Sequence, residues 1–152
     1  MQQDTAIVDA VAEELRALPG RPFANVLVGA ELDQQVRSSI QDTAAVVRLT
    51  ECSDDSKWPG ETVRTVRFEV TIVVREQDPE ARQVQLARLA GLVRRAIHGR
   101  SIADLTIPEY TRAEKRAGRY GKARPPDQTV VLQCEAAYLI DDEDDDEDPE
   151  EG

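Results

Sequence analysis

The stretch from Thr62 to Arg75 constrains the fold more than any other part of the chain. From Val66 to Val74 every second residue is apolar, in the order Val66, Phe68, Val70, Ile72 and Val74. Successive side chains of a β-strand point to opposite faces, so this period of two predicts a strand with one buried and one mostly polar face. The run has no Gly or Pro and is rich in β-branched residues, which favour pleated structure. Its fourteen residues exceed the usual strand of about five or six. Such a strand is long enough to project past its own domain and reach a neighbour.

Two amphipathic helices are predicted from apolar residues that recur at helical spacing. The first covers residues 4–18, with Asp4 or Thr5 as a cap for its first turn. The second runs from Pro79 to Ile97 or His98. Asp78 is a good N-cap for it, and Gly99 suits the position after its last turn.

The other strands are predicted from short apolar or alternating runs. They cover residues 24–30, 44–51 and 128–140, and residues 52–61 between two strands are expected to form a polar loop. The segment 31–43 fits a weak helical face, a loop or a ragged strand about equally well.

The resulting order, α-β-β-β-α-β, predicts an α+β fold. Two helices would cover one face of an antiparallel four-stranded sheet. The strands at 62–75 and 128–140 have matching alternation, so we expect them to be neighbours. The second face of the sheet is polar enough to meet water or another subunit. A length of 152 residues suits a single domain, which we place at residues 1–140.

Charge separates this domain from the C-terminal residues. The formal net charge is −11, but residues 141–152 hold ten acidic residues and no basic one. The rest of the chain therefore has 20 acids and 19 bases, a net charge of −1. Self-repulsion and the lack of apolar residues predict a disordered acidic tail at 141–152. The tail could be a solubilising appendage, a segment that docks on a basic partner, or a DNA-mimicking or lumen-repelling segment.

Residues 108–127 are predicted to form a basic loop before the last strand. Within it, the stretch Tyr110–Arg124 has one acid, Glu114, and six basic residues: Arg112, Lys115, Arg116, Arg119, Lys122 and Arg124. One interpretation is a mobile, solvated loop that pairs with nearby acidic surface, including the tail. The other is a contact to nucleic acid, in which the cations neutralise phosphates and Tyr110 or Tyr120 stacks on a base. The acidic tail would compete with nucleic acid for this loop.

No motif of a catalytic or cofactor site occurs in the sequence. There is no Gly-rich phosphate loop, GxSxG elbow, HExxH pair or EF-hand loop. Cys52, Cys134 and the single His98 are too few and too scattered for a structural zinc site. No apolar run of membrane-spanning length and no signal peptide is recognisable. We therefore expect a protein that is not an enzyme, binds no cofactor or metal, and does not enter a membrane.

Because no catalytic or cofactor site is recognisable, we looked for residues that could contact another subunit or a partner. Trp58 either folds back over the edge of the core or serves as an exposed anchor at an interface. Arg67, Glu69 and Arg75 belong to the polar face of the long strand, and Arg64 precedes its apolar run. We hypothesise that Arg64, Arg67 and Arg75 meet acids on the next subunit of a closed assembly, a head-to-tail contact. The basic residues of the loop 112–124 complete the candidate set.

The order and spacing of these elements resemble those of phage tail terminator (tail completion) proteins. These are small ring-forming subunits that cap the tail tube at its head-proximal end, and related head–tail neck subunits share the same layout. The resemblance covers roughly residues 5–140 and rests on element order rather than on a fixed motif. It lies in a helix at Thr5–Leu18, an arginine-flanked strand at Thr62–Arg75, a helix opening Asp78-Pro79-Glu80 and ending Arg94-Arg95-Ala96-Ile97, and a terminal strand at Thr129–Ile140.

The resemblance implies a homohexameric ring at the head–tail junction of a virion, assembled in the host cytoplasm. Its expected partners are the tail tube protein on one side and neck or connector proteins on the other, with DNA passing through without specific binding. Proteins of the family have no catalytic residues, so the resemblance implies none in this chain. The acidic tail and the basic loop have no counterpart in the family. The alternative is a non-catalytic adaptor or nucleic-acid-associated module that uses residues 112–124, with the tail as a regulator.

Overall fold

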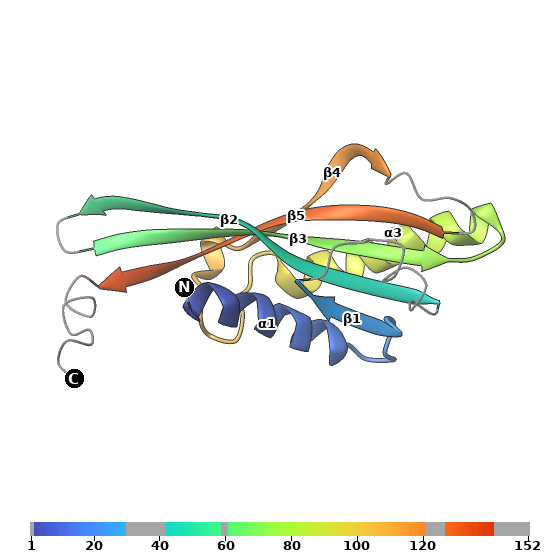
Figure 1. The fold of residues 1–152 in the computed structure, drawn as a ribbon, viewed down its shortest axis with the longest axis horizontal. Coiled ribbons are helices and arrows are strands. Elements are labelled where there is room, and N and C mark those ends of the chain that lie inside the picture. The colour runs from blue at the N-terminus through green and yellow to red at the C-terminus, as the bar shows by residue number, and fades with distance from the viewer. Residues whose placement is uncertain (1, 30–41, 59–60, 121–126, 142–152) are drawn as a thin grey trace.

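A five-stranded sheet runs the length of the molecule, with strand order β1-β2-β3-β5-β4 (Figure 1). The structure is a computed structural model and describes residues 2–29, 42–58, 61–120 and 127–141. The strands are β1 Asn25–Val28, β2 Thr43–Trp58, β3 Glu61–Arg75, β4 Arg112–Tyr120 and β5 Asp127–Asp141. β1 and β2 are parallel, and the other neighbours are antiparallel.

The α+β class and the adjacency of β3 and β5 are confirmed. The prediction of four antiparallel strands was incomplete, since the described residues form a sheet of five strands with one parallel pair. The predicted polar loop at 52–61 is wrong, because β2 continues through this segment to Trp58. Its acidic, serine-containing sequence has low β propensity, and cross-strand pairing with β3 outweighs that preference.

The predicted basic loop at 108–127 is wrong for residues 112–120, which form the additional strand, β4. A short 3-10 turn at Pro108–Tyr110 leads into it, and Arg112 to Lys115 pair with Glu135 to Leu132 of β5. An edge strand needs few apolar side chains and is often charged. Ala113 is fully buried, while Arg112 and Glu114 on either side of it are exposed. One small buried side chain between two charged ones is a weak signal of alternation.

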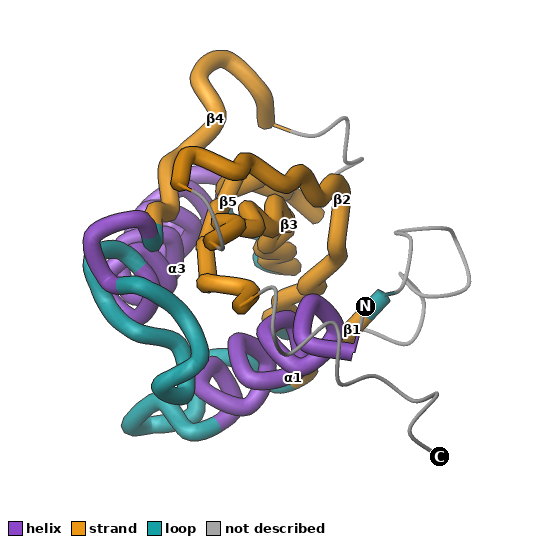
Figure 2. The backbone as a smooth tube through the Cα atoms, turned by 90° about the vertical axis from the view of Figure 1, so that its left-hand side faces the viewer, coloured by secondary structure: helices purple, strands orange, loops and turns teal. Residues whose placement is uncertain are grey.

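In the described part of the chain, two helices pack on one face of the sheet, here called the helix face. They are α1 Gln2–Arg16 and α3 Pro79–Ile97. An end-on view shows them along adjacent sides of the twisted strands, with β4 curling away (Figure 2). α3 begins and ends as predicted, and the Asp78 side chain accepts a hydrogen bond from the Glu80 N–H at 3.4 Å. α1 begins before Asp4, so the predicted cap role of Asp4 or Thr5 is wrong.

The core lies between the helices and the alternating residues of β3 and β5. All five apolar residues from Val66 to Val74 are buried, as are Val130, Leu132 and Cys134 of β5. They pack with Ile7, Val11 and Leu15 of α1 and with Leu86, Leu89 and Val93 of α3. The alternation of the long strand therefore placed the core correctly.

The sheet extends beyond the start of α1 as a three-stranded projection (Figure 1). We call this projection the arm and define it as Asp54–Trp58 of β2, Glu61–Arg64 of β3 and Tyr138–Asp141 of β5. No described helix covers the far end of the arm in Figure 1. The long β3 strand thus projects past the helical layer, as its length suggested.

Candidate functional site

The arm is tied to the rest of the molecule at one rung of the sheet. Asp54 is the Cα partner of Arg64 in β3, and Arg64 is the partner of Tyr138 in β5. Arg64 has the same parity as Val66 and Phe68, so all three members of the rung lie on the helix face. They therefore point toward α1 and not toward the second face of the sheet.

A β-bulge in β2 brings Asp54 to this face. Before the bulge, the residues of β2 on the helix face are odd-numbered, such as Ala45 and Val47. The pairing with β3 shifts between Leu49 and Glu51, where Thr50 is the extra residue. Its hydroxyl donates a hydrogen bond to the Arg67 carbonyl at 3.0 Å. After the shift the even-numbered residues, including Asp54, face the helices.

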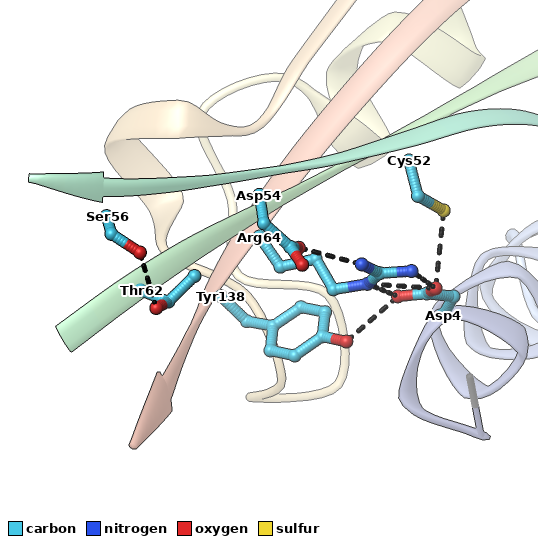
Figure 3. A network of polar contacts seen from close by, with 7 residues as sticks. All are labelled: Asp4, Cys52, Asp54, Ser56, Thr62, Arg64 and Tyr138. Carbon is cyan, nitrogen blue, oxygen red and sulfur yellow. Dashed lines mark hydrogen bonds and ion pairs between the residues drawn. The ribbon is translucent and has the colours of Figure 1, made fainter. Parts of the chain in front are cut away.

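The carboxylate of Asp4, in the first turn of α1, lies at the centre of the contacts (Figure 3). Asp4 is fully buried. Its oxygens accept hydrogen bonds from Arg64 Nε at 3.0 Å and Nη2 at 2.7 Å. The Tyr138 hydroxyl donates to it at 2.9 Å and the Cys52 thiol at 3.2 Å. We call these residues, together with Asp54, the anchor.

Arg64 links the two acids of the anchor. Its Nη1 forms an ion pair with Asp54 Oδ1 at 2.7 Å, and its side chain is only 19% exposed. One step further along the arm, the hydroxyls of Ser56 and Thr62 lie 2.9 Å apart (Figure 3). The geometry joins α1 to all three strands of the arm through charged, directional contacts.

The charge states of Asp4, Cys52 and Tyr138 are stable at neutral pH. The hydrogen bonds from Arg64 lower the pKa of Asp4 to about 2, although burial opposes this shift. Burial, followed by the neighbouring Asp4, raises the pKa of both Cys52 and Tyr138. Both groups stay protonated and keep donating to Asp4. A protonated, half-buried thiol is a poor nucleophile, so the arrangement suits fixed positioning better than covalent chemistry.

A second charged cluster lies on the opposite face of the sheet. Arg67 pairs with Glu51 at 3.4 Å and with Glu135 at 3.3 Å. Around it is a hollow of about 620 Å³ whose charged lining residues are Glu51, Arg67, Glu69, Arg112, Glu114 and Glu135. Arg67 is 43% exposed, and exposed pairs of this kind contribute about 0–1 kcal/mol each. The hollow is a solvated, mixed-charge surface.

The structure separates the predicted interface residues into two faces. Arg64 lies on the helix face, whereas Arg67 and Glu69 lie on the second face together with Arg112 at the start of β4. Arg75 is the last residue of β3 and has an interaction partner. The acids that Arg64 and Arg67 face lie within their own chain. Their contact with a neighbouring subunit remains a prediction.

For most of the other predicted interface residues, the structure describes the backbone position but not the side chain. Trp58 ends β2 and is paired with Glu61, and its side chain lies outside the description. The same holds for the side chains of Lys115, Arg116 and Arg119, which are positions of β4. Lys122 and Arg124 lie outside the described residues. The two interpretations of Trp58, and those of the basic residues 112–124, stay predictions.

Sequence reasoning missed the anchor itself: Asp4, Cys52, Asp54 and Tyr138. One signal was present, because Arg64 is two residues before Val66 and shares its parity. A cation on the core side of a strand requires a carboxylate partner. Nothing local in the sequence identifies that partner as Asp4, sixty residues away.

Among the described residues, no group of three or more His, Cys, Asp or Glu could hold a metal ion. None of the described helices combines the length and the apolar character that a bilayer crossing requires. Neither known family models nor curated proteins give a match to this chain.

Proposed function

We propose that the chain is a structural, non-catalytic subunit of a ring, resembling a phage tail terminator. The observation that carries the proposal is the arm, a three-stranded end of the sheet that projects past the helices (Figure 1). Leu139 on the arm is 56% exposed. A projecting sheet end with an exposed apolar side chain is suited to contact another molecule.

The anchor supports this role. An arm that mediates assembly must keep its direction, because a closed ring requires the same angle at every contact. Asp4, Arg64 and Tyr138 connect the arm to α1 by hydrogen bonds of 3.0 Å or less. This preorganisation lowers the entropy cost of association.

The proposed assembly is a homohexamer at the head–tail junction of a virion. In it the arm of one subunit contacts the body of the next in a head-to-tail arrangement. The tail tube protein would bind one side of the ring and neck or connector proteins the other. DNA would pass through without specific binding, and assembly would take place in the host cytoplasm.

A second candidate is a non-catalytic adaptor or nucleic-acid-associated module. It is favoured by Arg112, which is exposed at the start of β4 and precedes three further basic positions in that strand. In this candidate, residues 112–124 contact phosphates and the acidic residues 141–152 act as a regulator.

The mass of the full chain in solution tests the first candidate. We expect a hexamer by light scattering and rings by negative-stain microscopy. Leu139→Asp should shift the mass toward the monomer, because it places a charge in the proposed contact. Val84→Asp is the matched control, since Val84 is 69% exposed on α3, outside the arm.

A monomeric full chain at all accessible concentrations would refute the ring. A hexamer that is unchanged by Leu139→Asp would instead refute the arm as its contact surface. A monomer that binds duplex DNA with a steep salt dependence would favour the second candidate.

A further inference from the structure

The arginines whose side chains the structure describes differ in their partners. Arg64 and Arg67 are ion-paired with carboxylates of their own chain, as is Arg16. Arg48, Arg75 and Arg82 also have interaction partners. Arg21 and Arg100 are exposed in the turns after α1 and α3. Four more arginines are exposed on α3 and at the start of β4: Arg88, Arg94, Arg95 and Arg112. For these four the structure shows no ion pair with any described residue.

We call these four residues the basic surface. Residues 79–120, which contain it, carry nine Lys or Arg against four Asp or Glu. Arg94 and Arg95 also complement the negative end of the α3 dipole, an effect worth about 0.3–1 kcal/mol at an exposed site. That interaction uses the charge but not the hydrogen-bond donors of the guanidinium groups, which remain available to an anion.

A hollow of about 500 Å³ lies between the end of α3 and the start of β4. Arg94, His98 and Arg112 contribute cationic or donor groups to its lining, and Glu109 and Glu114 are also present. The Nδ1 atom of His98 accepts a hydrogen bond from the Ala113 N–H at 3.3 Å. The neutral ring therefore carries its proton on Nε2, which is left as a donor.

The acidic segment 142–152 begins within reach of this hollow, and its charge is opposite to that of the basic surface. β5 ends at Asp141, six residues beyond Glu135, which is the Cα partner of Arg112. At about 3.3 Å per residue this is about 20 Å along the strand. The following eleven residues, 142–152, hold nine acids and can span up to about 36 Å.

We propose that the basic surface is the docking site of the acidic segment 142–152 of the same chain. The charge of the segment is opposite to that of the surface, as it is for any anion that could bind there. The covalent tether favours this segment over a free anion, because it gives an effective concentration in the millimolar range. Docking covers Arg94 and Arg112 and screens them from competing polyanions such as nucleic acid. The proposal does not depend on ring formation.

Carbodiimide cross-linking of the full chain tests the proposal, because it joins a lysine amine to a carboxylate in direct contact. Arg94→Lys and Arg112→Lys keep the charge of the surface and add a reactive amine. Arg21→Lys is the matched control, since Arg21 is exposed in the turn after α1. The cross-linked sample is a mixture of unlabelled chains and chains labelled with heavy nitrogen. A link within one chain joins two peptides of the same isotope, whereas a link between chains can join peptides of different isotopes.

The expected result is links from the lysines introduced at positions 94 and 112 to peptides containing residues 142–152. Both ends of each link should carry the same isotope, and the yield should fall as salt screens the contact. Equal links from the Arg21→Lys control, or none from the surface variants, would overturn the proposal. Mixed-isotope links would also overturn it and would assign the surface to the acidic segment of a second copy.

Binding of a duplex DNA probe provides a second, independent measurement. Replacing the nine acids of 142–152 by Asn and Gln should strengthen DNA binding by about tenfold or more at low salt, since the surface is then uncovered. Arg94→Glu with Arg112→Glu should remove this gain. DNA binding that is equally tight with and without the acidic side chains would show that the segment does not cover the surface.

Discussion

Replacing Arg64 by Met tests the anchor most directly. The substitution keeps much of the aliphatic length of the side chain but leaves Asp4 without its cation. Asp4 is fully buried, and removing one partner of a buried ion pair typically costs about 3–5 kcal/mol. Asp4 keeps two hydrogen-bond donors in this variant, the Tyr138 hydroxyl and the Cys52 thiol. We therefore expect a loss of stability toward the lower end of that range.

The pKa of Asp4 provides a second measure of the same interaction. Its fall from 3.8 to about 2 corresponds to about 2 kcal/mol of stability at neutral pH. The pKa is lower in the folded state, so this stability is fully present above pH 4 and is lost as the pH falls toward 2. The stability difference between the wild-type chain and Asp4→Asn should therefore be constant at neutral pH and decrease below about pH 4.

Urea denaturation of Arg64→Met, Asp4→Asn and the double variant is the assay. The two single costs should not add, because both remove the same contact. Arg67→Met is the matched control on the same strand. Its partners are exposed, so its cost should stay within about 1 kcal/mol. Equal costs for Arg64→Met and Arg67→Met, or additive costs in the double variant, would refute the anchor as a buried, coupled unit.

Three further predictions concern other parts of the chain. Gly91→Ala should raise the free energy of unfolding by about 0.5–1 kcal/mol, because the added Cβ meets only Arg95 Nη1, at 3.7 Å; a loss of stability on thermal denaturation would contradict this. Deleting Thr50 should make the pairing of β2 with β3 regular and leave Asp54 opposite Arg64 on the helix face, so the urea midpoint should fall much less than in Arg64→Met; a fall as large as that of Arg64→Met would contradict this register. Cys134 is buried and its pKa is raised to about 12, mainly by burial; it should react with a thiol reagent only on unfolding, and rapid labelling of the native chain at neutral pH would be the contrary result.

Local patterns identified the elements that carry the core. The alternation from Val66 to Val74 located the buried face of β3, and the cap at Asp78 located the start of α3. Both predictions succeeded because the signal lies within a few neighbouring residues. The period of a strand and the satisfaction of the first helical N–H groups are local properties.

The elements that were missed depend on partners that are distant in the sequence. Residues 52–58 form a strand because β3 pairs with them, and Arg112–Tyr120 forms one because β5 offers an edge. Their own composition is polar and charged, which by itself indicates a loop. Pairing supplies the backbone hydrogen bonds that outweigh this intrinsic preference.

The sequence by itself determined the α+β class, the core face of β3 and the length that carries this strand past the helices. Only the tertiary structure decided the number of strands, the side of the sheet to which Asp54 turns, and the use of Asp4. The physical reason is that periodicity encodes which face of an element is apolar, while a buried carboxylate is defined by the donors that surround it. Arg64, Tyr138 and Cys52 reach Asp4 from separate strands, and they meet only once the sheet and α1 have packed together.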